Sequence, residues 1–80
     1  MPAYPIEARR QSQQGEVKLR VLVSAFGKAQ WVRVVESSGH ELLDNEAVKA
    51  VKQWEFEPKV IERARIELTI DVPISFKIAR

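Results

Sequence analysis

Seven apolar residues occupy every even position near the end of this 80-residue chain: Ile66, Leu68, Ile70, Val72, Ile74, Phe76 and Ile78. Charged and polar residues, together with Pro73, fill the odd positions between them. An apolar–polar period of two predicts a long strand with one face on a core and the other in water. A proline inside a strand has no N–H to donate, so Pro73 places this strand at a sheet edge or at a bulge.

The segment from residue 17 to residue 36 predicts a β-hairpin. Apolar residues at odd positions alternate with mostly polar ones over 17–23, and a second apolar run follows Phe26 and Gly27. Two such runs around a glycine-containing turn are typical of antiparallel neighbours. A turn centred between Phe26 and Gly27 gives three cross-strand pairs: Leu19 with Val34 and Val21 with Val32 on one face, and Leu22 with Trp31 on the other.

Two helices are expected around this hairpin. Pro5 suits a first helical turn and Gly15 is a stop signal, which predicts a short helix over 5–13. After the loop at 37–39, apolar residues recur at helical spacing as far as Trp54. Phe56 follows in extended chain, and both aromatic residues are expected to close the end of the core. The predicted core comprises Val21, Leu43, Ala47, Val51, Trp54 and Phe56.

The order α-β-β-α-β predicts an α+β fold, in which a three-stranded antiparallel sheet carries both helices on one face. A right-handed crossover brings the last strand beside the first, so the predicted sheet order is 2-1-3. The last strand is then an edge, as Pro73 requires. Its odd residues Asp71, Ser75 and Lys77 direct backbone N–H and C=O groups outward. Natural proteins usually protect such an edge from pairing with another chain. A long edge is therefore either protected in this way or used to bind a partner.

Composition narrows the classes of function. The chain is short enough to form one domain, 1–80, and has no cysteine for a disulfide or a thiolate metal site. Its 13 basic and 11 acidic residues are interspersed, whereas a nucleic-acid-binding surface gathers basic residues on one side. Neither a membrane span nor a leader peptide is visible. The sequence begins almost directly on predicted structure, so we expect either a one-domain protein or a domain cut from a longer one.

No catalytic chemistry is predicted. The one histidine, His40, lies near Ser37, Ser38 and Asp44, where a loop leads into a helix. We interpret this group as a loop and helix cap, because catalytic triads are assembled in space from separate elements. The three glycines are scattered and form no phosphate-binding loop. We therefore expect no metal site, no cofactor and no enzyme activity.

The sheet face opposite the helices is expected to stay in water. It places Arg20 opposite Arg33, where the positive charge is neutralised either by an acidic residue of the last strand at position 67 or 71, which we expect, or by a bound anion. It also places Trp31 on Leu22. That contact is either a simple cross-strand pair or a sticky patch for a partner or a second copy.

The chain resembles the C-terminal domain of TonB, the energy-transducing protein of Gram-negative envelopes. The resemblance covers nearly the whole chain and rests on a combination of motifs rather than on one. These are Tyr4-Pro5, Gly15 before the first strand, Gly27 in the hairpin, Ser37-Ser38-Gly39, Leu43-Asp44, Trp54-x-Phe56-x-Pro58 and Val72-Pro73-Ile74-x-Phe76. The chain departs from the best-known members at Trp31, where the family usually has a small or polar residue, and in having almost nothing before Tyr4.

This resemblance implies a function. In this family the full-length protein is attached to the inner membrane and extends through the periplasm. It couples the proton-motive ExbB–ExbD complex to outer-membrane receptors for siderophores, vitamin B12 and similar nutrients. The last strand of the domain captures a short receptor segment, the TonB box, by strand addition. The residues that the resemblance assigns to this role are Tyr4, Pro5, Asp71, Val72, Pro73, Ile74, Ser75, Phe76, Lys77 and Ile78.

One alternative of another class stays open. A TolA-like or TonB-like module of an envelope scaffold would self-associate or bind peptidoglycan, with Leu22 and Trp31 as its interaction patch and a homodimer as one arrangement. An enzyme or a nucleic-acid-binding protein ranks last. Binding of a TonB-box peptide separates the first two functions.

Overall fold

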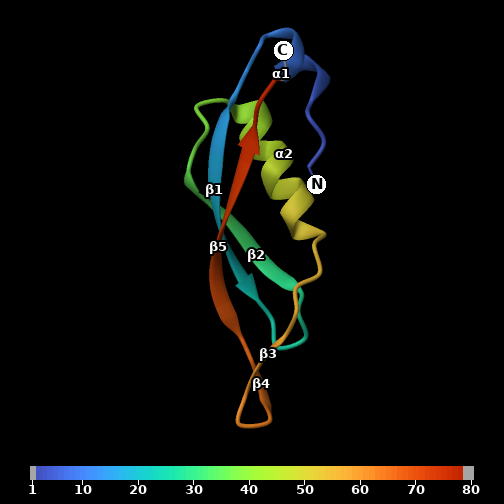
Figure 1. The fold of residues 1–80 in the computed structure, drawn as a ribbon, viewed down its shortest axis with the longest axis vertical. Helices are drawn as coiled ribbons and strands as arrows, with labels where there is room; N and C mark the ends of the chain where they lie inside the picture. The colour runs from blue at the N-terminus through green and yellow to red at the C-terminus, as the bar shows by residue number, and fades with distance from the viewer. Residues whose placement is uncertain (1, 79–80) are drawn as a thin grey trace.

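Strand β1 (Gly15–Val23) is the central strand of a three-stranded antiparallel sheet in the order β2-β1-β5 (Figure 1). The computed structural model describes residues 2–78, so residues 1, 79 and 80 of the expected domain lie outside it. The other elements are α1 (Ile6–Arg10), β2 (Ala29–Glu36), α2 (Glu41–Lys52), β3 (Lys59–Ile61), β4 (Ala64–Ile66) and β5 (Leu68–Phe76). The predicted α+β class and the 2-1-3 sheet order are confirmed.

The hairpin register agrees with the prediction at every pair that was specified. Leu19 lies opposite Val34, Val21 opposite Val32 and Leu22 opposite Trp31. The ladder is irregular at both of its ends, since Lys18 pairs with Glu36 and Val23 pairs with Ala29. One extra residue on β2 at each place is the pattern of a β-bulge, which bends an edge strand and increases its twist.

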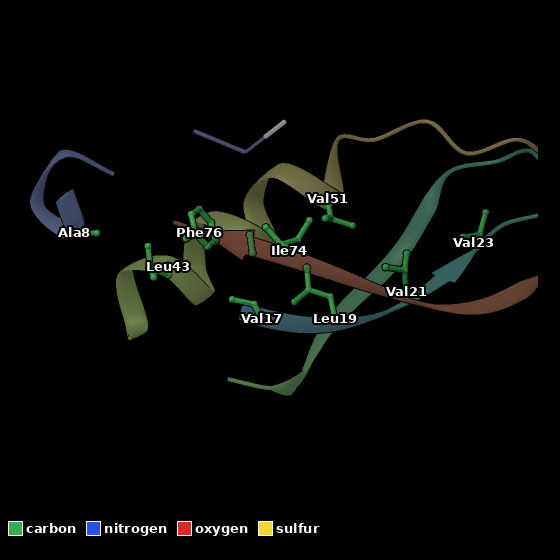
Figure 2. Close-up of a cluster of buried hydrophobic side chains, with 10 residues drawn as sticks. Ala8, Val17, Leu19, Val21, Val23, Leu43, Val51, Ile74 and Phe76 are labelled. Carbon is green, nitrogen blue, oxygen red and sulfur yellow. The ribbon is translucent and has the colours of Figure 1, made fainter. Parts of the chain in front are cut away.

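The core lies between the sheet and α2 (Figure 2). It takes Leu43, Ala47 and Val51 from α2, whose spacing puts them on one face of the helix. α1 contributes the fully buried Ala8 at the end of the molecule. The sheet contributes alternate residues of β1 and the C-terminal half of β5, namely Val17, Leu19, Val21, Val23, Ile74 and Phe76.

α1 is shorter than the predicted helix over 5–13, because it ends at Arg10. Ser12 adopts a left-handed conformation with φ of 55°. The N–H of Ser12 bonds to the carbonyl of Arg9, and the N–H of Gln13 bonds to the carbonyl of Ala8. These two bonds form a Schellman motif, in which serine occupies the position that glycine usually takes. The prediction that Gly15 stops this helix was wrong.

The exit from α2 also differs from the prediction. The helix ends at Lys52, and Trp54 follows in a turn closed by a bond of 3.1 Å from its N–H to the Val51 carbonyl. Trp54 and Phe56 are half-buried and pack against the core, with ring centroids 6.2 Å apart. They cover the core edge rather than lying inside it.

The segment after Trp54 is fastened to the turn between β1 and β2. The N–H of Phe56 donates to the carbonyl of Gly27 over 2.8 Å. Lys28 and Glu55 form an isolated β-bridge and an ion pair of 2.7 Å. We call these contacts of Gly27 and Lys28 with Glu55 and Phe56 the exit clamp. The clamp fixes the start of the chain that leads from the helix into the last strands.

Strands β3 and β4 form a two-stranded arm that the sequence did not predict. They project at the end of the molecule opposite α1 (Figure 1). Their turn consists of Glu62 and Arg63, both at positive φ, with values of 51° and 69°. The arm interrupts the predicted long strand, because Ile66 ends β4 and Leu68 begins β5. The arm leaves Val60, in β3, 56% exposed.

Candidate functional site

Within residues 2–78, β5 pairs with β1 alone and forms an outer edge of the sheet. Pro73 lies opposite Lys18, and the register runs without a bulge from Gly15 opposite Phe76 to Val23 opposite Leu68. Antiparallel ladders alternate bonded and non-bonded pairs. Since Pro73 has no N–H, the bonded pairs are those on either side of it. The N–H and C=O groups of the odd residues of β5 therefore face outward.

The predicted site residues of β5 alternate between exposed side chains at odd positions and buried or half-buried ones at even positions. Asp71, Pro73 and Ser75 are exposed, whereas Ile74 and Phe76 are buried. Val72 is half-buried and packs on the core from the same side as Ile74. Lys77 and Ile78 lie beyond the end of β5. The N–H of Ile78 donates to Oε1 of Gln14 over 2.9 Å, so this even residue bonds toward the β1 side.

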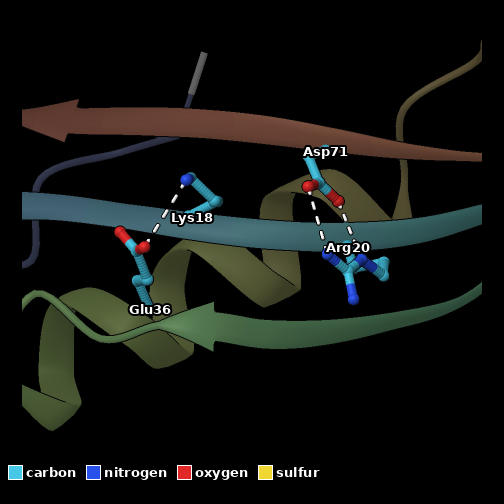
Figure 3. A network of polar contacts seen from close by, with 4 residues as sticks. All are labelled: Lys18, Arg20, Glu36 and Asp71. Carbon is cyan, nitrogen blue, oxygen red and sulfur yellow. Dashed lines mark hydrogen bonds and ion pairs between the residues drawn. The ribbon is translucent and has the colours of Figure 1, made fainter.

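Charged side chains hold β5 to β1 across the open face of the sheet. Asp71 accepts two hydrogen bonds from Arg20, of 2.9 Å from Nε and 3.2 Å from Nη2 (Figure 3). This hydrogen-bonded pair keeps the pKa of Asp71 below its ordinary value and raises the pKa of Arg20. Lys18 and Glu36 form a longer ion pair of 3.5 Å on the β2 side. The expected neutralisation of Arg20 by an acidic residue of the last strand is confirmed at Asp71.

Tyr4 and Pro5 lie at the end of the sheet where β5 finishes. The Tyr4 ring meets Phe76 edge-on, with 5.4 Å between the ring centroids and 78° between the planes. Its hydroxyl donates to the carbonyl of Gln13. Pro5 precedes α1, and its carbonyl accepts the Arg9 N–H over 3.0 Å. The structure therefore brings Tyr4 to the predicted strand, while Pro5 starts the helix.

A groove of about 380 Å³ runs beside this end of β5. Trp54 and Tyr4 form part of its wall, and Pro2, from the N-terminal segment, also lines it. The remaining lining comes from β5 and the residue after it: Pro73, Ile74, Ser75, Phe76 and Lys77. Sequence reasoning missed Pro2 and gave Trp54 a purely structural role. No local pattern signals this groove, because distant segments meet there.

The open face carries the predicted pair of Trp31 and Leu22. Trp31 and Leu22 lie opposite each other and are both half-buried. The guanidinium carbon of Arg33 lies 4.1 Å from the centroid of a Trp31 ring, a cation–π contact. Arg33 therefore covers part of the tryptophan surface that sequence reasoning left free.

Asp44, in the first turn of α2, binds the two serines of the loop that precedes this helix. Asp44 accepts bonds from the Ser38 N–H and hydroxyl, of 2.9 and 2.8 Å, and from the Ser37 hydroxyl. Partial burial acts to raise the pKa of Asp44, but these hydrogen bonds outweigh it and keep that pKa below its ordinary value. His40 is the N-cap residue and makes no side-chain cap bond.

Within residues 2–78, no three His, Asp or Glu side chains gather closely enough to hold a metal ion. No helix in the same part of the chain has the length and apolarity that a membrane crossing requires. The candidate site that the geometry offers is the β5 edge with its groove.

The chain is similar in sequence to known proteins over nearly its whole length. The family model of the Gram-negative bacterial TonB protein C-terminal matches residues 1–78. The protein tonB2 of Pseudomonas aeruginosa is 44% identical over 77 residues, which are 96% of this chain and 28% of that protein. Protein TonB of Vibrio cholerae is 35% identical over 96% of this chain and 32% of that protein. The chain thus spans about a third of the length of these relatives.

Solved structures give the same result. The solution structure of the Pseudomonas aeruginosa TonB C-terminal domain superposes with a TM-score of 0.84 at 28% identity, covering all of this chain and 81% of that one. The tonB2 protein of Vibrio anguillarum gives a TM-score of 0.77 at 31% identity, covering all of this chain and 76% of that one. The match in fold, in sequence and in extent shows that the chain belongs to the family of Gram-negative bacterial TonB protein C-terminal domains.

Proposed function

We propose that residues 1–80 form one receptor-binding domain of a TonB-like energy transducer, located in the periplasm. It binds the TonB box of outer-membrane receptors by adding the receptor segment as a strand beside β5. Regions outside this chain attach the protein to the inner membrane and contact ExbB and ExbD. The domain then couples the proton-motive force to uptake of siderophores, vitamin B12 and similar nutrients.

The observation that carries this proposal is the free edge of β5. Its outward backbone groups at Asp71 and Ser75 offer hydrogen bonds to an extended partner, which is the basis of strand addition. Pro73 removes one donor but leaves its carbonyl available. Main-chain bonds of this kind are independent of partner side chains, so one edge serves several receptors with different segments.

Arg20 supports this role by holding the edge in place. Its paired hydrogen bonds to Asp71 tie β5 to β1 on the open face, while Ile74 and Phe76 anchor the other face in the core. An edge held on both faces keeps its backbone groups in register before a partner arrives. Preorganisation of this kind lowers the entropic cost of binding.

The test is mapping of backbone amide chemical shifts by NMR during titration with a synthetic TonB-box peptide. We expect the largest shifts at residues 69–77. Shifts confined to residues 24–36, on β2 and its turn, with β5 silent, would show that the other edge of the sheet is the one used.

A second function rests on the open face. Trp31, Leu22 and Arg33 form an aromatic and cationic patch there, and an envelope scaffold module would use it for self-association or for peptidoglycan binding. Sedimentation of the chain at increasing concentration, and pull-down with purified peptidoglycan, test this candidate. It requires that Trp31→Ala abolish the association that these assays detect.

A further inference from the structure

The groove beside β5 has a feature that backbone pairing alone does not use. Its lining is mainly apolar, and Trp54 also borders a second hollow of about 400 Å³ on the α2 side, where Pro2 and Ala3 lie over the helix. Trp54 is thus half-buried against the core on one side and open to two hollows on the other. An indole in such a place presents a large rigid apolar surface to whatever enters.

The geometry of the sheet decides which part of a bound strand reaches the groove. Side-by-side residues in neighbouring strands point to the same face, and successive residues alternate between faces. A partner residue beside Ile74 or Phe76 points to the helix-covered face, where the groove lies. A partner residue beside Ser75 points to the open face and remains in water.

We infer that this groove is a specificity pocket, which takes a bulky apolar side chain of an extended segment bound along β5. Trp54 and Tyr4 set its size. The inference rests on the proposed strand addition and adds the identity of the side chains that this edge selects. In the selected segment, every second residue faces the groove and is apolar. The residues between them face water and can be of any type.

The free edge determines that the occupant is an extended peptide. An extended backbone matches the spacing of the outward N–H and C=O groups along β5. The groove is continuous with that edge, since Pro73, Ser75 and Lys77 line it. Among residues 2–78, those that line the groove include no acidic residue, and the one charged residue among them, Lys77, is exposed. An apolar side chain is therefore the chemistry that the groove accepts at lowest cost.

The first test uses three blocked seven-residue peptides. One alternates threonine and valine, and in the others alanine or phenylalanine replaces every valine. We expect the valine peptide to bind at least about tenfold more tightly than the alanine peptide, because each buried methylene group strengthens binding several-fold. Equal affinity of both peptides, while both shift the amides of 69–77, would overturn the specificity pocket and leave strand addition intact. If none of the peptides shifts those amides, strand addition itself fails.

The second test changes the pocket. Trp54→Leu enlarges the groove and should raise the affinity for the phenylalanine peptide, relative to the valine peptide, about tenfold. Trp31→Leu makes the same chemical change on the open face and should leave that ratio unchanged. If the leucine variant does not fold, Trp54→Phe replaces it in the same comparison of peptide affinities. An unchanged ratio in a folded Trp54 variant contradicts the inference, since a merely structural role for Trp54 would not alter peptide preference.

A third readout follows Trp54 directly. The chain has two tryptophans, so Trp31→Phe leaves Trp54 as its only indole. Entry of a valine side chain should shift Trp54 emission to shorter wavelength and protect it from acrylamide quenching. Binding to β5 without either change would place the peptide side chains outside the groove and refute the inference.

Discussion

Replacing Gly27 by alanine tests how firmly the exit clamp holds the fold together. Gly27 has a φ of 85°, and a Cβ added there would lie 2.1 Å from the carbonyl oxygen of Phe56. The left-handed backbone costs a residue with a Cβ about 1–2 kcal/mol. The steric conflict also breaks the bond from the Phe56 N–H to the Gly27 carbonyl, which contributes about 0.5–1.5 kcal/mol. We expect Gly27→Ala to lower the free energy of unfolding by about 1.5–3.5 kcal/mol.

Thermal and urea unfolding followed by circular dichroism measure this loss. In a domain of this size, each kcal/mol lowers Tm by about 4–8 °C. Gly39→Ala is the matched control, because Gly39 has a similar φ of 91° but open space where its Cβ would lie. The control should lose only the backbone contribution. Equal losses in the two variants would show that contact with Phe56 adds nothing, which would refute the role of the clamp.

Three other variants test the core, the loop and the open face. Trp54→Ala should cost about 2–3 kcal/mol of unfolding free energy, below the usual range for a fully buried aromatic, because Trp54 is half-buried; an unchanged urea midpoint would contradict its packing role. The pKa of Asp44 is lowered in the folded chain, so its stabilising effect is present above its ordinary value of 3.8 and is lost as pH falls through the folded pKa. In Asp44→Asn, the free energy of unfolding should therefore fall less on acidification than in the parent chain. Part of the fall should remain, because the pKa values of Asp71 and Glu55 are also lowered. Trp31→Ala should cost about 1 kcal/mol through the lost contacts with Leu22 and Arg33; a variant as stable as the parent chain would show that these contacts contribute nothing.

The sheet could be predicted because two independent signals agreed. Apolar alternation and a turn at Gly27 gave the same hairpin register, and Pro73 marked the last strand as an edge. A shift of one residue would have moved every apolar side chain to the water face, so the register was strongly specified. The edge of the candidate site followed from the same reasoning.

The missed features depend on tertiary contacts or on atypical residues. Ser12 ends α1, and Glu62 with Arg63 turns the β3–β4 arm, at positive φ values that glycine or asparagine usually signals. The groove beside β5 forms only when Pro2 and Trp54 meet the last strand in space. No local sequence pattern carries that information.

The proline variant of Ser75 tests the proposed strand addition most directly. Ser75→Pro removes an outward N–H from β5, while the core residues on either side remain. Ser75→Ala is the matched control, because it also loses the hydroxyl bond of 3.1 Å to Glu16 but keeps the backbone donor. Circular dichroism establishes that both variants fold.

Calorimetric titration with a TonB-box peptide then compares the two variants. We predict that Ser75→Pro binds more weakly than Ser75→Ala by roughly 1–3 kcal/mol, the cost of leaving a buried backbone group of the peptide unpaired. If the folded proline variant binds the peptide as tightly as the alanine variant, the backbone of β5 does not carry the interaction and strand addition at this edge is contradicted.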